Sequence, residues 1–260
     1  MNNLNLKNTA EALIDTFIAA GDLAKQISHH GVKITIKADN SPVTDGDLAV
    51  DKILKAKIEK ITPNIPMISE ETVDLSIKVN KEKKNFWLID PIDGTRDYIN
   101  KKEEYTLNAA LIINLKPVIG IIYAPAKERL FYSYGKNLAF EINKGKKIIL
   151  NCQKKNVNEI IGLENSRATP LEVEKIYKKY KVTKTLKMSS SLKFCTLAAG
   201  EADIYAANAR AYEWDIAAGH AILEHSGGNV TNHKSESFLY GKNKYKNLPL
   251  LALRSTLVNK

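Results

Sequence analysis

The sequence has few cysteines, few arginines and no long apolar run. Its two cysteines, Cys152 and Cys195, are too few for a disulfide framework or a cysteine-rich zinc site. Only five of the 39 basic residues are arginine, the side chain best suited to paired hydrogen bonds with bases and phosphates. No apolar run approaches the roughly 18–20 residues of a membrane-spanning helix, and the polar N-terminus lacks a signal-peptide core. We therefore expect a cytoplasmic protein with no membrane span.

Lysine gives the chain a formal net charge of +10. Because the lysines are dispersed, they indicate a solubilising surface or attraction of an anionic substrate. A nucleic-acid-binding protein is an alternative of another class, and it would show steeply salt-dependent binding. We expect no stable nucleic-acid complex. Peripheral association with the inner membrane stays open for so basic a chain.

Apolar periodicity predicts a mixture of helices and strands over the 260 residues. Helices are expected over residues 6–28, 44–62, 170–180, 191–199 and 214–225. Strands are expected over residues 86–89, 106–114, 118–123, 131–134, 138–142, 160–163, 185–188, 203–207 and 248–253. The pattern changes near residue 150, so we predict two packed subdomains, 1–150 and 151–260.

Residues 87–95 carry the strongest chemical signal. An apolar strand leads directly into Asp90 and Asp93. The intervening proline fixes one backbone angle, and Gly94 permits the turn that follows. Two carboxylates and a turn carbonyl are the oxygen ligands that Mg²⁺ prefers, and the N–H groups near Gly94 and Thr95 suit a phosphate. An Asp-Pro turn with a helix cap is the structural alternative.

Two further acidic positions follow apolar segments. Glu70 and Glu71 end a short apolar run, and Asp215 follows Trp214 at the start of a predicted helix. An ordinary loop would explain the first pair, and a helix N-cap would explain Asp215. Three element ends that each offer carboxylates nevertheless suggest one metal cluster assembled from distant parts of the chain.

Together these segments resemble the magnesium-dependent, lithium-sensitive phosphomonoesterases, a family that includes inositol monophosphatase. The motif Asp-Pro-Ile-Asp-Gly-Thr stands at 90–95, and Trp-Asp-x-Ala-Ala-Gly stands at 214–219. Residues 37–47, with Asp39 and Asp47, and the Glu70-Glu71 pair complete the pattern in the family's order. The resemblance implies an α/β (α+β) fold, a layered αβαβα sandwich of the inositol monophosphatase and fructose-1,6-bisphosphatase type, with the metal site between two subdomains.

The resemblance also implies roles for individual residues. Two or three Mg²⁺ ions would be bound by Glu70, Asp90, Ile92 (through its carbonyl), Asp93 and Asp215. Asp90 would bridge a pair of ions. Asp47 would reach a third ion through water, or would instead close a capping box with Thr44.

Catalysis would follow from the same resemblance. Glu70 and Thr95 would position an attacking water whose pKa the metal lowers, and attack would be in line without a covalent intermediate. The residues implied to contact substrate are Asp93, Gly94, Thr95, Ser190, Lys193 and Asp215.

Residues 190–195 resemble the bacterial 3′(2′),5′-bisphosphate nucleotidase branch, as do residues 105–108 and 120–125. Inositol phosphatases usually lack a lysine where Lys193 stands, and a second phosphate would give that ammonium a partner. A solvated helix residue is the alternative for Lys193. Three departures weaken this assignment: residues 166–169 lack a substrate-facing histidine, Ser189 replaces a usual glycine, and residues 206–210 lack a usual proline.

The expected reaction is hydrolysis of adenosine 3′,5′-bisphosphate to AMP and phosphate. An inositol or sugar monophosphatase is the alternative, because both reactions would use the metal ligands alike. The resemblance also implies a place in sulfur metabolism, lithium inhibition and a homodimer. Other chemistries have little support: the histidines show no metal-ligand spacing, and we expect Cys195 in the core rather than as a nucleophile.

Overall fold

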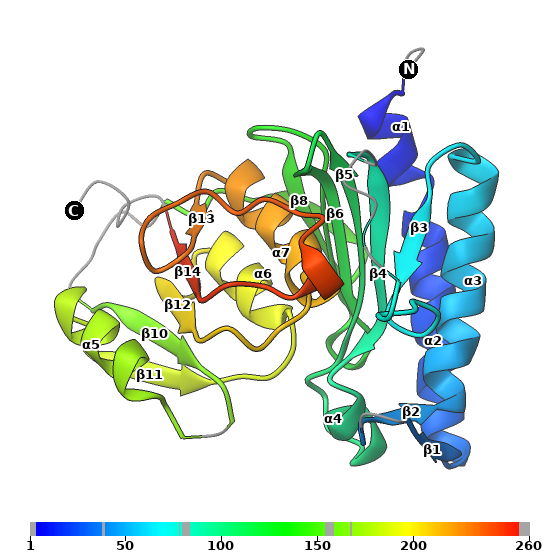
Figure 1. Cartoon of the computed structure of the whole chain (residues 1–260), viewed down its shortest axis with the longest axis horizontal. Helices are drawn as coiled ribbons and strands as arrows, with labels where there is room; N and C mark the ends of the chain where they lie inside the picture. Colours follow the sequence, from blue (N-terminus) through cyan, green and yellow to red (C-terminus); the bar gives the residue numbers. More distant parts are fainter. Residues whose placement is uncertain are drawn as a thin grey trace.

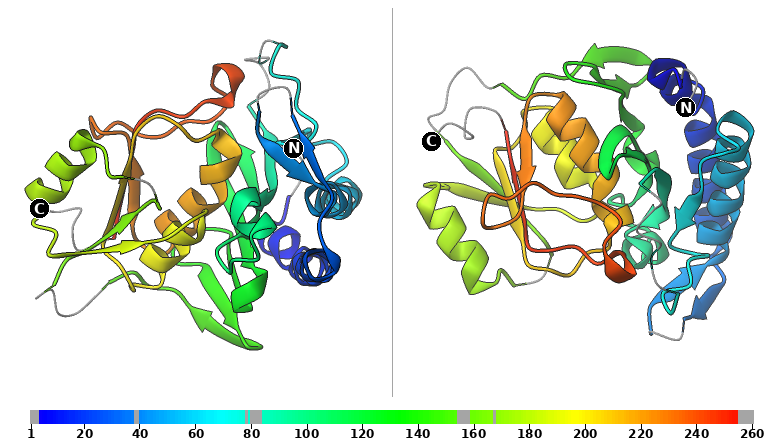
Figure 2. Two further views of the ribbon diagram at one scale, coloured as in Figure 1. Left: turned by 90° about the horizontal axis from the view of Figure 1, so that it is seen from below. Right: turned by 45° about the horizontal axis from the view of Figure 1, so that its top comes forward.

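The computed structural model describes residues 4–37, 40–77, 79, 84–153, 159–166 and 168–254. Its elements form five layers, helix, sheet, helix, sheet and helix, from right to left in Figure 1. The two further views in Figure 2 keep the same order of layers. The predicted αβαβα sandwich is therefore confirmed. None of the described helices is long and apolar enough to cross a bilayer.

The first layer contains helices α1 (Leu6–Glu11), α2 (Ile14–His30) and α3 (Asp45–Ile61). The prediction of one continuous helix over residues 6–28 is wrong, because the chain tightens into a turn after α1. There the N–H of Leu13 donates to the carbonyl of Ala10 at 3.2 Å, and the Leu13 side chain is fully buried. A hairpin of β1 (Ile34–Ile36) and β2 (Pro42–Thr44) joins α2 to α3.

The second layer is a seven-stranded sheet in the order β3-β4-β5-β6-β7-β8-β9. Its strands are β3 (Met67–Ser69), β4 (Phe86–Asp93), β5 (Thr106–Ile113), β6 (Lys116–Ala124), β7 (Arg129–Ser133), β8 (Ala139–Asn143) and β9 (Lys146–Ile149), with the 3₁₀ turn η1 (Pro125–Lys127) after β6. Only β3 and β4 pair in parallel; the other pairs of this sheet are antiparallel.

Both faces of this sheet are covered, which explains the continuous apolar sequence of β4. Trp87 and Ile89 pack with the residues of α2 and α3, whereas Phe86 and Leu88 pack on the opposite side with α6 (Leu192–Ala198) and α7 (Glu213–His225). Helix α7 lies very close to β6, since a Cβ atom on Gly120 would stand 2.2 Å from the carbonyl oxygen of Ala218. Glycine at position 120 is therefore needed for this helix-to-sheet contact.

The remaining layers follow α6 and α7. A five-stranded sheet has the order β11-β10-β12-β14-β13, and α5 (Leu171–Lys179) covers its outer face. Its strands are β10 (Ile161–Glu164), β11 (Lys184–Lys187), β12 (Ile204–Ala207), β13 (Asn229–Thr231) and β14 (Leu250–Leu253), and two short helical turns, α4 (Thr95–Ile99) and η2 (Asn243–Tyr245), lie near the sheet ends. The change of sheet falls between β9 and β10. The division into subdomains at residue 150 stays a prediction.

Candidate metal centre and adjoining pocket

The parallel pairing of β3 with β4 places two acidic residues side by side. Ser69 pairs with Ile89 in the register, so Glu70 and Asp90 follow at the same edge of the sheet. The N–H of Glu70 donates to the carbonyl of Ile89 at 3.1 Å, which fixes this neighbourhood. Asp215 reaches the same place from the first turn of α7.

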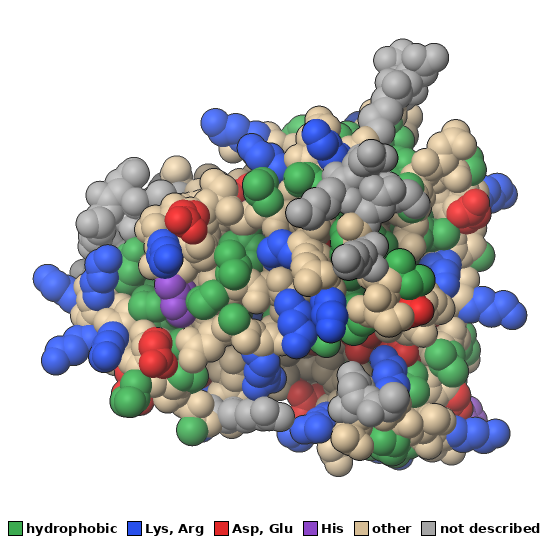
Figure 3. All heavy atoms as spheres, in the orientation of Figure 1, with side chains coloured by type: hydrophobic (Ala, Val, Ile, Leu, Met, Phe, Trp, Pro, Cys, Tyr) green, Lys and Arg blue, Asp and Glu red, His purple; other side chains and the backbone are tan. Residues whose placement is uncertain are grey.

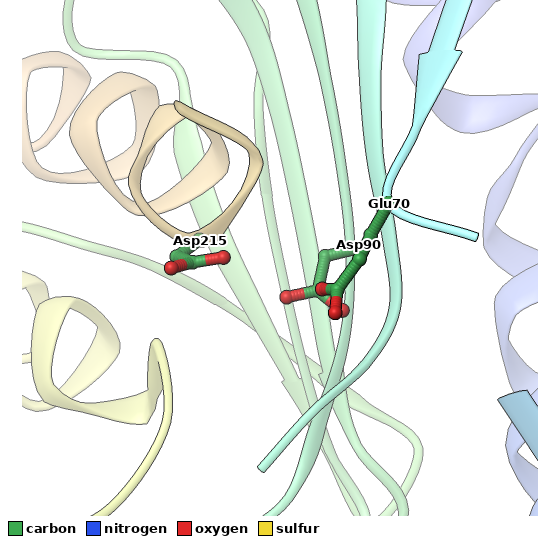
Figure 4. A group of neighbouring side chains, drawn as sticks. All are labelled: Glu70, Asp90 and Asp215. Atoms are coloured by element: carbon green, nitrogen blue, oxygen red, sulfur yellow. The ribbon is translucent and has the colours of Figure 1, made fainter. Parts of the chain in front are cut away.

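The three carboxylates converge, as Figure 4 shows. One oxygen from each of Glu70, Asp90 and Asp215 lies within 4.8 Å of the others. The predicted meeting of three element ends is therefore confirmed for these residues. Their joint donor set is entirely oxygen, which suits a hard divalent cation.

The end of β4 supplies the rest of the predicted motif. Its pairing with β5 shifts register between Asp90 and Asp93, so the strand bulges where the two acids stand. The hydroxyl of Thr95 donates to the carbonyl of Ile92 at 3.2 Å. Gly94 has a φ of 94° as the N-cap of α4, a conformation that glycine adopts without strain. The motif thus turns back on itself beside the carboxylates.

Burial makes Asp90 and Asp215 hard to ionise without a cation. It is the main cause that raises the pKa of Asp90 well above its usual range, followed by the charges of Glu70 and Asp93. Burial also raises the pKa of Asp215 strongly, with Asp93 as the next cause. The Oδ1 atom of Asp90 is buried without a hydrogen-bond partner among the described residues. A bound cation would supply that partner and offset the repulsion, so the residues fit a metal ion.

Asp93 connects the carboxylate cluster to its surroundings. Burial raises its pKa to about 6, and the opposing effect comes first from the charge of Lys193. Its Oδ2 atom accepts a hydrogen bond from the backbone N–H of Ser191. Asp93 thus lies between the other acids and the turn that leads into α6.

Asp47 adopts the capping arrangement that the sequence offered as one of two possibilities. Its carboxylate accepts the N–H of Thr44 at 2.7 Å, and the Thr44 hydroxyl accepts the N–H of Asp47 at 3.2 Å. Its other oxygen lies 3.4 Å from the hydroxyl of Thr95. Burial raises the pKa of Asp47 to about 6. The capping box is confirmed, whereas a water-mediated metal contact stays a prediction.

Lys37 is a neighbour of the centre to which the sequence analysis gave no role. Its ammonium pairs with Glu71 at 2.8 Å and with Glu70 at 3.3 Å. Burial raises the pKa of Glu71 to about 7, although the ion pair with Lys37 opposes that shift. The sequence did contain one indication of a nearby cation, because Glu70 and Glu71 are adjacent acids that would otherwise repel each other. Asp39, which completes the family pattern in the same segment, lies outside the described residues.

A pocket of about 280 Å³ adjoins the carboxylates and shares Asp93 and Asp215 with them. Lys193 lines it and is only 4% exposed, so the alternative of a solvated helix residue is wrong. Its ammonium donates to the carbonyls of Ser190 and Met188 at 2.8 and 3.1 Å. Burial lowers the pKa of Lys193 to about 8, against the effect of Asp93.

The rest of the pocket wall contains one further predicted substrate contact and two positions that depart from the family pattern. Ser190 lines the pocket with a φ of 57°, and the exposed Arg210 lines it near Lys193. Ala168 and Thr169 also line the pocket, and they belong to the segment that lacks the substrate-facing histidine of the bisphosphate nucleotidase branch. The departures from the bisphosphate nucleotidase pattern at these two positions therefore fall on the pocket wall. Arg167 lies outside the described residues.

Three hydroxyl and amide side chains support the turn before α6. The hydroxyl of Ser191 donates to Oδ1 of Asn108 at 2.7 Å and lies 2.8 Å from the Thr106 hydroxyl. From the sequence, Thr106 and Asn108 contributed only to the family resemblance. Two polar side chains within an apolar strand could have indicated that both residues support the site. Cys195 is fully buried in this helix, as predicted, and burial raises its pKa well above the usual value.

Comparison with known proteins agrees with this geometry. The 3′(2′),5′-bisphosphate nucleotidase CysQ of Buchnera aphidicola is 38% identical over 200 residues, covering 76% of this chain and 74% of that protein. The protein of the same name in Escherichia coli strain K12 is 31% identical over 224 residues, covering 85% and 89%.

Solved structures give the same result. The crystal structure of CysQ from Bacteroides thetaiotaomicron superposes with a TM-score of 0.79 and 28% identity, covering 97% of this chain and 99% of the other. An inositol monophosphatase from Anabaena shares the fold with a TM-score of 0.76 at 22% identity, covering 98% and 94%. Residues 5–252 match the inositol monophosphatase family as a whole, and the chain therefore belongs to that family.

Proposed function

We propose that this chain is a metal-dependent phosphatase that hydrolyses adenosine 3′,5′-bisphosphate to AMP and phosphate. The observation that carries the proposal is Lys193, a buried ammonium in a pocket that shares Asp93 and Asp215 with the carboxylate cluster. A cation beside a metal centre suits a substrate with two phosphates, one at each site. Further support comes from the Buchnera and Escherichia coli relatives, which carry the name of that activity.

We assign Mg²⁺ to the centre. Glu70, Asp90 and Asp215 would hold it, with Asp93, the Ile92 carbonyl and Asp47 as further predicted ligands. Bound Mg²⁺ lowers the pKa of a coordinated water and offsets the negative charge of the reacting phosphate. The buried Oδ1 atom of Asp90, which has no hydrogen-bond partner among the described residues, supports this assignment.

The chain's own groups would orient the reactants. The hydroxyl of Thr95 lies between the carbonyl of Ile92 and the carboxylate of Asp47, at 3.2 and 3.4 Å. This placement holds the hydroxyl at the end of β4, where it and Glu70 would orient the attacking water. The turn at Gly94 would present backbone N–H groups to the phosphate. The water would supply oxygen to phosphorus as the bond from phosphorus to the 3′ oxygen breaks.

The second phosphate would be recognised in the pocket by Lys193 and Ser190, and we add Arg210 to this set. Lys193 is buried and bonded to two carbonyls, so its ammonium is held in one place. Arg210 is exposed on the same pocket wall and would act at longer range. On the face shown in Figure 3, Lys and Arg side chains surround a hollow in which acidic side chains are visible. Such a ring of cations would attract an anionic substrate toward an acidic centre.

We also propose a cytoplasmic enzyme of sulfur metabolism, inhibited by lithium and assembled as a homodimer. The free cysteines, Cys152 and Cys195, support a reducing compartment because both are unpaired. Size-exclusion chromatography with light scattering tests the dimer, and activity with added Li⁺ tests the inhibition.

The first experiment compares phosphate release from adenosine 3′,5′-bisphosphate and from inositol 1-phosphate in Mg²⁺. An Asp90→Asn variant gives the background for both. We expect a clear preference for the nucleotide. Preference for inositol phosphate would favour the alternative monophosphatase, for which Thr169 and Ala168 in the pocket wall are the supporting observation. Release from neither substrate, with Mg²⁺ bound, would reject both candidates.

A further inference from the structure

A buried glutamate next to the metal centre contacts one distant segment through its carboxylate. Glu213 is fully buried, and its carboxylate accepts the N–H groups of Gly241 and Lys242 at 2.8 and 2.9 Å. The ammonium of Lys242 pairs with the same carboxylate at 2.8 Å. We call residues 241–247 the strap; they lie in the orange-red part of the chain in Figure 1. A buried carboxylate needs such donors, so Glu213 and the strap hold each other in place.

The far end of the strap holds the residues just before Glu213. The side-chain amide of Asn247 donates to the carbonyl of Tyr212 at 2.6 Å, and its backbone N–H donates to the carbonyl of Ala211 at 3.0 Å. Tyr212 and Lys246 also form an isolated antiparallel bridge. The strap therefore holds the entry to α7 at two points, on either side of η2.

That entry sets the position of Asp215. The backbone N–H of Tyr212 donates to the Oδ2 atom of Asp215 at 2.9 Å. The Tyr212 ring stacks on Trp214 with 4.7 Å between ring centres and 12° between planes. Any shift of Tyr212 would thus move a hydrogen-bond donor on the carboxylate that faces Glu70 and Asp90.

We propose that Glu213 is a positioning residue for the metal centre. It holds the strap, the strap holds Tyr212, and Tyr212 orients the carboxylate of Asp215. The inference rests on the proposed function in one respect, namely that Asp215 binds metal. Groups that orient a metal ligand typically contribute about 10–100-fold to metal affinity, whereas a purely structural carboxylate would affect only the stability of the fold.

The test measures Mn²⁺ binding to the full chain by the loss of the free-ion electron paramagnetic resonance signal. We expect Glu213→Gln to weaken binding about 10-fold, because the amide N–H would face one of the backbone N–H donors that the carboxylate now accepts. The matched control is Glu141→Gln. Glu141 is also a buried carboxylate, paired with Arg129 at 2.6 Å, but it lies on β8, four strands from β4 in the sheet order. The control should lose thermal stability and keep its Mn²⁺ affinity within about twofold of wild type. Equal losses of affinity in both variants would overturn the proposal.

A double-mutant cycle separates this proposal from the function it rests on. If Glu213 acts through Asp215, the pair Glu213→Gln and Asp215→Asn should weaken Mn²⁺ binding no more than Asp215→Asn alone. Additive losses would overturn the positioning role. If Asp215→Asn weakens binding and Glu213→Gln does not, only the positioning role is wrong. If Asp215→Asn itself has no effect, the metal role of Asp215 falls as well. Asn247→Ala, which releases Tyr212 and leaves the Glu213 carboxylate intact, carries the same cycle if Glu213→Gln does not fold.

Discussion

Ser191, at the entry to α6, donates its backbone N–H to the Asp93 carboxylate at the end of β4. The bond joins a residue beside the pocket lysine to one of the acids that we predict to bind metal. Lys193 lies two residues further along and affects the same carboxylate, since its charge is the largest effect opposing the raised pKa of Asp93. The pocket and the carboxylate cluster are therefore one electrostatic unit, and a substrate with two phosphates would contact both parts.

The first prediction concerns Asp90 and has two opposite effects. Asp90→Asn should weaken metal binding and lower phosphate release by about 100-fold or more, because it removes a charged ligand. The metal-free variant should nevertheless be more stable than wild type, because the raised pKa of Asp90 reflects burial and repulsion in the folded state. A gain of about 1 kcal/mol would raise the melting temperature by roughly 2–4 °C.

Differential scanning fluorimetry in a chelator and again in Mg²⁺ measures both effects for Asp90. Asp51→Asn serves as a control, since Asp51 is a buried carboxylate bonded to Ser69 and Lys55 outside the cluster. It should lose stability in both conditions. A metal-free Asp90→Asn variant that melts below wild type would contradict the repulsion argument.

The second prediction concerns Lys193. Lys193→Met keeps an unbranched side chain of similar length and removes the ammonium. The KM for adenosine 3′,5′-bisphosphate should rise about 10–100-fold, the loss expected for a charge-assisted hydrogen bond of roughly 1.5–3 kcal/mol. The KM for 3′-AMP, which lacks the second phosphate, should change little. Steady-state kinetics on both substrates measures the difference, with Lys184→Met on exposed β11 as the control. Equal effects on both nucleotides would mean that Lys193 does not recognise the second phosphate.

The third prediction concerns Arg210, which lines the pocket but is exposed. Arg210→Gln should raise the KM for the bisphosphate by less than about fivefold, since exposed ion pairs contribute roughly 0.2–1 kcal/mol. The difference from wild type should shrink as salt rises, because salt screens exposed charges. The Lys193→Met effect should persist at high salt, because Lys193 is buried. Kinetics at low and high KCl separate the two cations, and a salt-independent effect of Arg210→Gln would be inconsistent with action at long range.

Much of the site was predictable because its chemistry lies in short segments. Asp90 and Asp93 stand in one run with a proline and a glycine, so their turn is encoded locally. The meeting of Glu70 with Asp90 depends on parallel pairing of β3 with β4, which the sequence did not specify, although the three acidic element ends already predicted one shared cluster. The break in the helix at Leu13 was not predicted because no glycine or proline stands there. In the structure the break is a tight turn in which the Leu13 side chain is buried.

The contacts that the sequence did not predict join residues far apart in the chain. Lys37 reaches Glu70 and Glu71 from the β1–β2 hairpin, and Glu213 reaches the strap 28 and 29 residues later. In the sequence alone, Lys37 and Glu213 have no feature that distinguishes them from other charged residues next to loops. Only the burial of these charged groups in the structure shows that the pairs matter. That burial results from the packing of the layers, which the apolar periodicity of the sequence does not predict.

The fourth prediction concerns pH and the metal. Burial raises the pKa of Asp93 and of Asp47 to about 6, so the metal-free fold binds more protons than the unfolded chain between about pH 4 and 6. These acids therefore stabilise the metal-free protein at low pH, and that contribution is lost as pH rises through 6. His225 acts in the opposite direction, because burial lowers its pKa to about 4 and its contribution is lost as pH falls.

The effect of His225 cancels when stability with Mg²⁺ is compared with stability without it at each pH, since it lies outside the cluster that would bind the ion. The increase in melting temperature caused by a fixed Mg²⁺ concentration should therefore grow steadily from pH 4 to 7, as fewer protons compete for the carboxylates. Asp215→Asn should flatten this dependence, because it removes one of the carboxylates for which protons and Mg²⁺ compete. A stabilisation by Mg²⁺ that stays constant over this range would mean that the ion binds away from these acids.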